Sequence, residues 1–175
     1  MLRAALKKYQ GEEKGTINVT EILEKPLSER KAGIVERYLL ALIIQSGYLP
    51  DGLDEKIFEQ SQMREIFQKV RALKEKEGRL KIKILAKTIP EPLLEAFDEL
   101  LLLEIDEETL VDNQRTEKEI SYCAKRLKGL NLRTKLRELS LAIKQAESVD
   151  NKGKIASLSQ EFRDLSKTLF RLEEK

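Results

Sequence analysis

The 175 residues include no histidine, so the side chains that remain for chemistry are carboxylates, one thiol and basic groups. This absence excludes catalytic triads and metal sites that depend on an imidazole. A carboxylate cluster offers oxygen ligands for a cation: Glu104, Asp106, Glu107 and Glu108. The cluster lacks the turn glycine and ligand spacing of a calcium loop. We therefore interpret it as a charged helix end, and we expect no catalytic residue, metal or cofactor.

The thiol belongs to Cys123, the only cysteine of the chain. A single cysteine excludes an intrachain disulfide and the usual zinc sites, and it favours a reducing, cytoplasmic compartment. Cys123 also belongs to an apolar stripe at helical spacing, with Ile120, Leu127 and Leu130. The stripe favours a small core residue over a nucleophile.

Basic residues are concentrated in one stretch, and acidic residues in another. Between Lys125 and Arg137 there is no acidic residue, and the six basic ones are Lys125, Arg126, Lys128, Arg133, Lys135 and Arg137. Between Lys87 and Arg115 there are nine acidic residues and no basic one. Such polarity orients partners. The basic stretch has few interleaved aromatics and no nucleic-acid motif. We expect a solvated helix face there, with phosphate contact as the alternative, and no direct contact with nucleic acid.

The composition predicts an all-α fold. Apolar residues make up 41% of the chain, charged residues 37% and aromatic residues 5%, with 8 glycines and 4 prolines. Such a mixture favours helices over sheets. No apolar run is long enough to span a membrane, and no secretory signal is recognisable. We therefore expect a cytoplasmic protein without a membrane partner.

Three regions follow from the turn signals. Residues 1–25 are expected to form a linker or the tail of a preceding domain, 26–130 a helical bundle, and 131–175 a C-terminal helical hairpin. In the bundle, Ser28 and Ser61 are predicted helix N-caps, and Gly47 and Gly78 are predicted helix ends. Residues 80–84 alternate like a strand, but because no partner strand is evident we interpret them as a short helix.

One long helix is predicted from about Asn113, with a weak point near its middle. The apolar stripe jumps from Leu130 to Leu132, which rotates the apolar face by about 200°. The jump coincides with Gly129 and Asn131. We expect a break there and a hinge at these two residues.

The chain ends in two apolar stripes separated by turn-forming residues. The first stripe is Leu132, Leu136, Leu139, Ile143 and Ala146, and the second is Ile155, Leu158, Phe162, Leu165, Leu169 and Leu172. Both stripes should hold the hairpin together, which leaves Leu141 and Phe170 exposed. We hypothesise that Leu141 and Phe170 anchor a partner, with Arg163, Lys167 and Arg171 at the rim. Scattered surface residues are the alternative.

Two segments together resemble a known family. The segment from Glu36 to Leu49, with Ile57-Phe58 and Met63 to Phe67, is similar to the opening of the helicase-binding domain of bacterial DNA primase. The segment from Ile143 to Lys154, continued by Leu158, Phe162, Leu165 and Leu169, resembles the C-terminal hairpin of primase. The resemblance implies a helical bundle and a long connecting helix before a hairpin that docks on the hexameric replicative helicase. Primase catalysis would lie upstream, so this region would be a non-catalytic part of a DNA-directed RNA polymerase that makes primers.

Two other interpretations stay open. The N-terminal domain of a replicative helicase has a similar helical pattern, and a generic helical adaptor would dimerise through the hairpin. We expect a monomer, with a hairpin-mediated dimer as the alternative.

Overall fold

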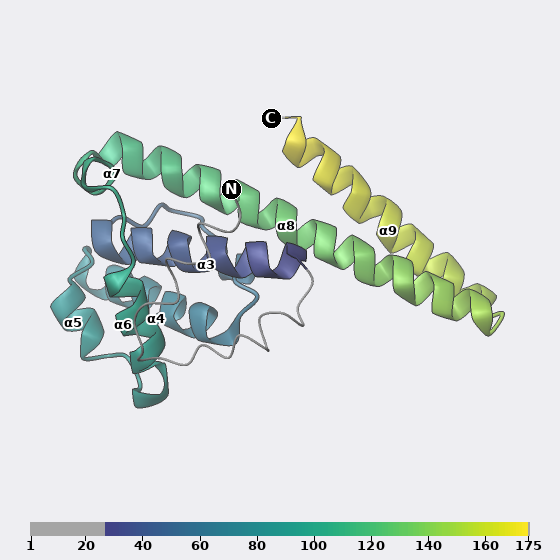
Figure 1. The fold of residues 1–175 in the computed structure, drawn as a ribbon, viewed down its shortest axis with the longest axis horizontal. Coiled ribbons are helices and arrows are strands. Elements are labelled where there is room, and N and C mark those ends of the chain that lie inside the picture. Colours follow the sequence, from purple (N-terminus) through teal and green to yellow (C-terminus); the bar gives the residue numbers. More distant parts are fainter. Residues whose placement is uncertain (1–26, 175) are drawn as a thin grey trace, which may run out of the picture.

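A computed structural model describes residues 27–174, which fold as helices joined by short loops (Figure 1). In chain order the elements are α3 (Leu27–Ser46), η1 (Glu55–Ile57), α4 (Ser61–Glu77), α5 (Ile82–Ala86), η2 (Glu91–Leu93), α6 (Leu94–Leu102), α7 (Glu107–Val111), α8 (Asn113–Ser148) and α9 (Lys152–Glu173). The predicted all-α fold is confirmed. The expected linker at residues 1–25 lies outside the described residues.

Helix α3 runs through the centre of the globular part (Figure 1). Its six consecutive apolar residues from Leu39 to Ile44 are each at most 1% exposed. A helix that is apolar on all sides must be covered on all sides, and α4, α6 and α8 provide this cover. The longest apolar run of the sequence is therefore a core helix. Within residues 27–174, no helix has both the length and the apolar character that crossing a bilayer requires.

The predicted glycine ends of α3 and α4 agree with the structure better than the predicted N-terminal caps do. Gly47 and Gly78 follow the two helices with φ angles of 70° and 72°, a conformation that favours glycine. At the other end, α4 begins at Ser61 and Gln60 is the capping residue, so the predicted cap is one residue out. The buried carboxylate of Glu36 accepts the backbone N–H groups of Glu59 and Gln60. These bonds hold the backbone just ahead of α4, and within the described residues no side chain caps the helix itself.

The middle of the chain forms short helices. Residues 82–86 form α5, so the alternating segment 80–84 is helical from residue 82 onward and not over its first two residues. Leu93 at the end of η2 and Phe97 in α6 are buried, whereas Leu94 at the start of α6 is 39% exposed. Helix α7 was not expected. Asp106 caps it by accepting a hydrogen bond from the backbone N–H of Thr109 at 3.1 Å.

Helix α8 is continuous from Asn113 to Ser148, so the predicted break at Gly129–Asn131 is wrong. Asn131 is only 8% exposed, and its side-chain amide donates a hydrogen bond to the Ile57 carbonyl at 2.8 Å. The apolar face rotates at this point because α8 has two packing partners. Its first half packs on α3 and its second half on α9. A helix with two apolar faces explains the jump without a break.

The second half of α8 and all of α9 form an antiparallel hairpin that extends beyond the globular part (Figure 1). The turn comprises residues 149–151, and Asp150 adopts a φ of 49°. Asn151 then caps α9, because its side-chain oxygen accepts the backbone N–H of Lys154 at 3.1 Å.

Replacing glycine by alanine should have opposite effects at two helix positions. Gly129 lies inside α8, and an added Cβ would be 3.7 Å from Cδ2 of Leu172, an ordinary contact distance. We expect Gly129→Ala to raise the free energy of unfolding by about 0.5–1 kcal/mol through helix propensity. Gly78→Ala should lower it by about 1 kcal/mol, because the left-handed conformation strains alanine although the space is open. Urea denaturation of both variants measures the two changes. A loss of stability in Gly129→Ala would contradict the close but unstrained packing of α9 on α8.

Candidate protein-interaction surface

Helix α9 is held by half-buried contacts. All six residues of its apolar stripe are partly covered, and no side chain of α9 is fully buried. The covering surface is provided chiefly by the second half of α8. One side of α9 is therefore committed to the hairpin, and its other sides face solvent.

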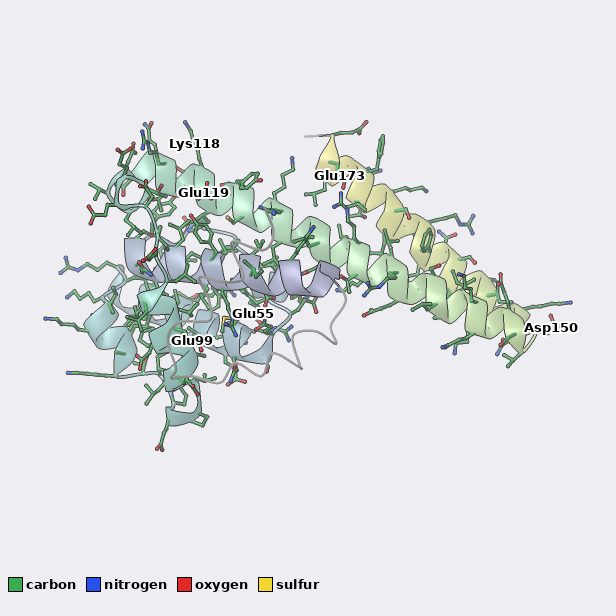
Figure 2. All side chains as sticks on the ribbon, in the orientation of Figure 1. Glu55, Glu99, Lys118, Glu119, Asp150 and Glu173 are labelled. Carbon is green, nitrogen blue, oxygen red and sulfur yellow. The ribbon has the colours of Figure 1, made fainter. Side chains whose placement is uncertain are left out.

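The open end of the hairpin is closed by two contacts between α8 and α9. Leu172 lies against Gly129, with its Cδ2 3.7 Å from where a Cβ of residue 129 would be. Beside it, Nη2 of Arg133 lies 2.5 Å from Oε1 of Glu173, which is labelled near the end of α9 in Figure 2. Both partners of this ion pair are at least half exposed, so it contributes at most about 1 kcal/mol. Gly129 therefore has a packing role, and together with the buried Asn131 it joins the hairpin to the globular part.

Phe170 is the large apolar residue that α9 leaves exposed, at 61% of its surface. Three exposed basic residues, Arg163, Lys167 and Arg171, follow one another in steps of four, so they lie along one side of α9. Phe170 is three residues after Lys167 and thus borders this row. The structure brings four of the five predicted contact residues onto one helix. A ring bordered by cations suits a partner that has an apolar pocket and acidic surroundings.

The fifth predicted contact residue, Leu141, is 54% exposed on α8 but lies well away from Phe170. Leu172 marks the level of Gly129 on the hairpin, and Leu141 is about 18 Å further along α8. Leu141 and Phe170 therefore form two separate contact points. A partner that uses both must follow the hairpin over several turns.

A polar cavity of about 360 Å³ lies between α3, the start of α4 and α8. Glu36 is 1% exposed at its wall, and Lys135 pairs there with Glu59 at 3.7 Å. Burial raises the pKa of Glu36 to about 7, although the backbone N–H groups of Glu59 and Gln60 and the charge of Arg64 oppose the rise. Since the carboxyl binds the backbone ahead of α4, we infer that it positions this helix.

The other candidate groups for chemistry have structural roles. Cys123 is buried, and burial, reinforced by Glu119, raises the pKa of its thiol to about 12. Such a thiol is a poor nucleophile. In the carboxylate cluster, Asp106 caps α7 and Glu108 pairs with Arg115. Within the described part of the chain, no three metal-ligating side chains come together.

Sequence reasoning missed two exposed side chains near the hairpin. Val149 is 71% exposed in the turn, and Tyr122 is 57% exposed on α8. Tyr122 precedes Arg126 by four residues, so the two side chains are neighbours on the helix. The four-residue spacing of Tyr122 and Arg126 is the sequence signal that indicates this pair.

Comparison with known proteins does not assign the chain to a family. No protein-family model matches the chain, and no curated protein matches it significantly.

The buried carboxyl predicts a specific dependence of stability on pH. Because the pKa of Glu36 is higher in the folded chain than its ordinary value of 4.5, folding favours the protonated form. Its contribution is complete below about pH 4.5 and is lost as the pH rises through about 7. Stability should fall by at most about 3 kcal/mol between pH 5 and 8. The chain contains no histidine to titrate in this range. Thermal denaturation across these pH values measures the effect.

The matched variant is Glu36→Gln, which keeps an oxygen acceptor for the backbone of Glu59 and cannot ionise. We expect its melting temperature to vary less between pH 5 and 8 than that of the wild type. Parallel curves for both proteins would exclude Glu36 as the titrating group.

Proposed function

We propose that this chain is a helicase-interaction module of DNA primase. It would act in the cytoplasm, bring primase to the hexameric replicative helicase at the replication fork, and modulate primer synthesis without catalysing a reaction itself. The hairpin would be the docking element, and the globular part would hold it at a fixed orientation.

The observation that carries the proposal is the exposed Phe170, bordered by basic side chains on a helix that is held on one side only. In many interfaces, a buried aromatic side chain at the centre supplies much of the binding energy, and charged residues lie at the rim. The surfaces of α9 that face solvent leave room for such a partner.

A second support is that the side chains best suited to chemistry have structural roles. The only thiol is in the core, and the carboxylate cluster is used for helix capping and ion pairing. These roles favour function through surface contact over catalysis, and they agree with the resemblance of the two helical segments to primase.

Two other functions compete with this proposal. A replicative helicase N-terminal domain would use the hairpin to contact copies of itself within a ring, and a helical adaptor would use it to dimerise. Light scattering of the isolated chain separates these cases, since a stable dimer or ring through the hairpin would favour the rivals.

Helicase binding should depend on both exposed apolar residues of the hairpin. We expect Phe170→Ala to weaken affinity for the hexameric helicase of the same organism by about tenfold or more. Leu141→Ala should weaken it as well, while Lys167→Glu should mainly slow association and reduce its dependence on salt. Surface plasmon resonance on the immobilised helicase measures affinity and rates.

Leu102→Ala is the matched control, because Leu102 is 82% exposed on α6, away from the hairpin. Its affinity should equal that of the wild type. Unchanged binding by both hairpin variants, with intact helical circular dichroism, would refute the proposal.

A further inference from the structure

A second hollow, which we name the cationic hollow, lies where α3, the middle of α8 and the last turn of α9 meet. Its volume is also about 360 Å³. Its charged and aromatic lining consists of Lys31, Tyr122, Lys125, Arg126, Arg133 and Glu173. The hollow therefore joins residues that are more than 140 positions apart in the sequence.

The positive charge of this hollow is largely uncompensated. Glu173 is the single carboxylate in the lining, and Arg133 already binds it at 2.5 Å. Lys31, Lys125 and Arg126 form no ion pair with any residue that the structure describes. Like charges that converge in this way repel one another, and an anionic ligand would relieve the repulsion.

Two arginines elsewhere in the globular part are paired with carboxylates. Arg71 pairs with Glu55 at 3.5 Å, and Arg37 pairs with Glu99 at 3.1 Å. Those cations are neutralised within the protein. In the cationic hollow, by comparison, three cations without an ion pair among the described residues line the same concave surface, which suits it to an external anion.

The aromatic ring of Tyr122 indicates the chemical class of the anion. Tyr122 is 57% exposed at the hollow, one helical turn before Arg126. Within residues 27–174, Tyr122 and Phe170 are the aromatic side chains that are more than half exposed. A phosphate group or a carboxylate needs only the cations, whereas a nucleobase also gains from stacking on a ring.

We propose that the cationic hollow binds single-stranded nucleic acid. Lys31, Lys125 and Arg126 contact phosphates, and Tyr122 stacks on a base. A single strand fits better than a duplex, because its bases can turn out to reach a ring beside a concave surface. This site goes beyond helicase docking and lies on other side chains than Phe170 and Leu141. It takes up phosphate contact, the alternative that the sequence left open for the basic stretch.

The test is fluorescence anisotropy of a labelled oligothymidylate titrated with the full chain over a range of salt concentrations. We expect binding at low salt, with affinity falling as salt rises. The double variant Lys125→Ala/Arg126→Ala should reduce the slope of log affinity against log salt by about 1.4, or about 0.7 for each lost phosphate contact. Tyr122→Ala should weaken binding by about tenfold, while Tyr122→Phe, which keeps the ring, should retain it.

The matched control is Lys152→Ala/Lys154→Ala, which removes the same charge from the far end of the hairpin. Equal losses in this control and in the Lys125/Arg126 variant would overturn the proposal by showing non-specific attraction. Polyglutamate that competes fully, with no effect of Tyr122→Ala on oligothymidylate, would also overturn it in favour of an acidic peptide. Absence of binding at low salt would do the same.

The helicase experiment is independent of this one. The Lys125→Ala/Arg126→Ala variant retains Phe170 and Leu141, so its helicase affinity should match that of the wild type. Loss of oligothymidylate binding with helicase affinity unchanged would support the cationic hollow as a separate site.

Discussion

The structure depends on the burial of two apolar faces of one helix, α8. Its first face, with Ile120, Cys123 and Leu127 at 4% exposure or less, covers the central helix α3. Its second face, beyond Asn131, is the surface on which α9 packs. Because a single continuous helix carries both faces, the hairpin and the globular part have a fixed relative orientation. That shared helix positions the exposed residues of the hairpin and the cationic hollow.

The same arrangement explains why α9 remains available to a partner. The apolar centre of α3 is covered by neighbouring helices, whereas α9 buries one stripe only partly and leaves the remainder to solvent. Half-buried apolar contacts stabilise less per residue than core contacts. The hairpin is therefore stabilised less per residue than the core, but it exposes more surface to a partner. The Gly129–Leu172 contact and the Arg133–Glu173 ion pair hold its open end together.

Polar groups inside the molecule have definite structural tasks. Glu36 on α3 binds the backbone just ahead of α4, and Asn131 connects α8 to the Ile57 carbonyl. Both residues join segments that are far apart in the chain. A buried polar group without partners would be costly, and no buried side-chain nitrogen or oxygen of the described residues lacks one. These bonds fix the register in which α3, α4 and α8 pack.

Local rules in the sequence determined the helical class, the glycine ends of α3 and α4, and the apolar stripes of the hairpin, since spacing and backbone preference act within a few residues. They also predicted the exposure of Phe170 and Leu141. They failed at Ser61, where the cap is Gln60 and the distant Glu36 holds the backbone ahead of the helix, and at Gly129–Asn131, where a change of packing partner resembled a break. Only the tertiary structure decided that Lys31, Tyr122 and Arg126 share one hollow with Glu173. The physical reason is that convergence of charge depends on how helices cross, which residue spacing within one helix does not encode.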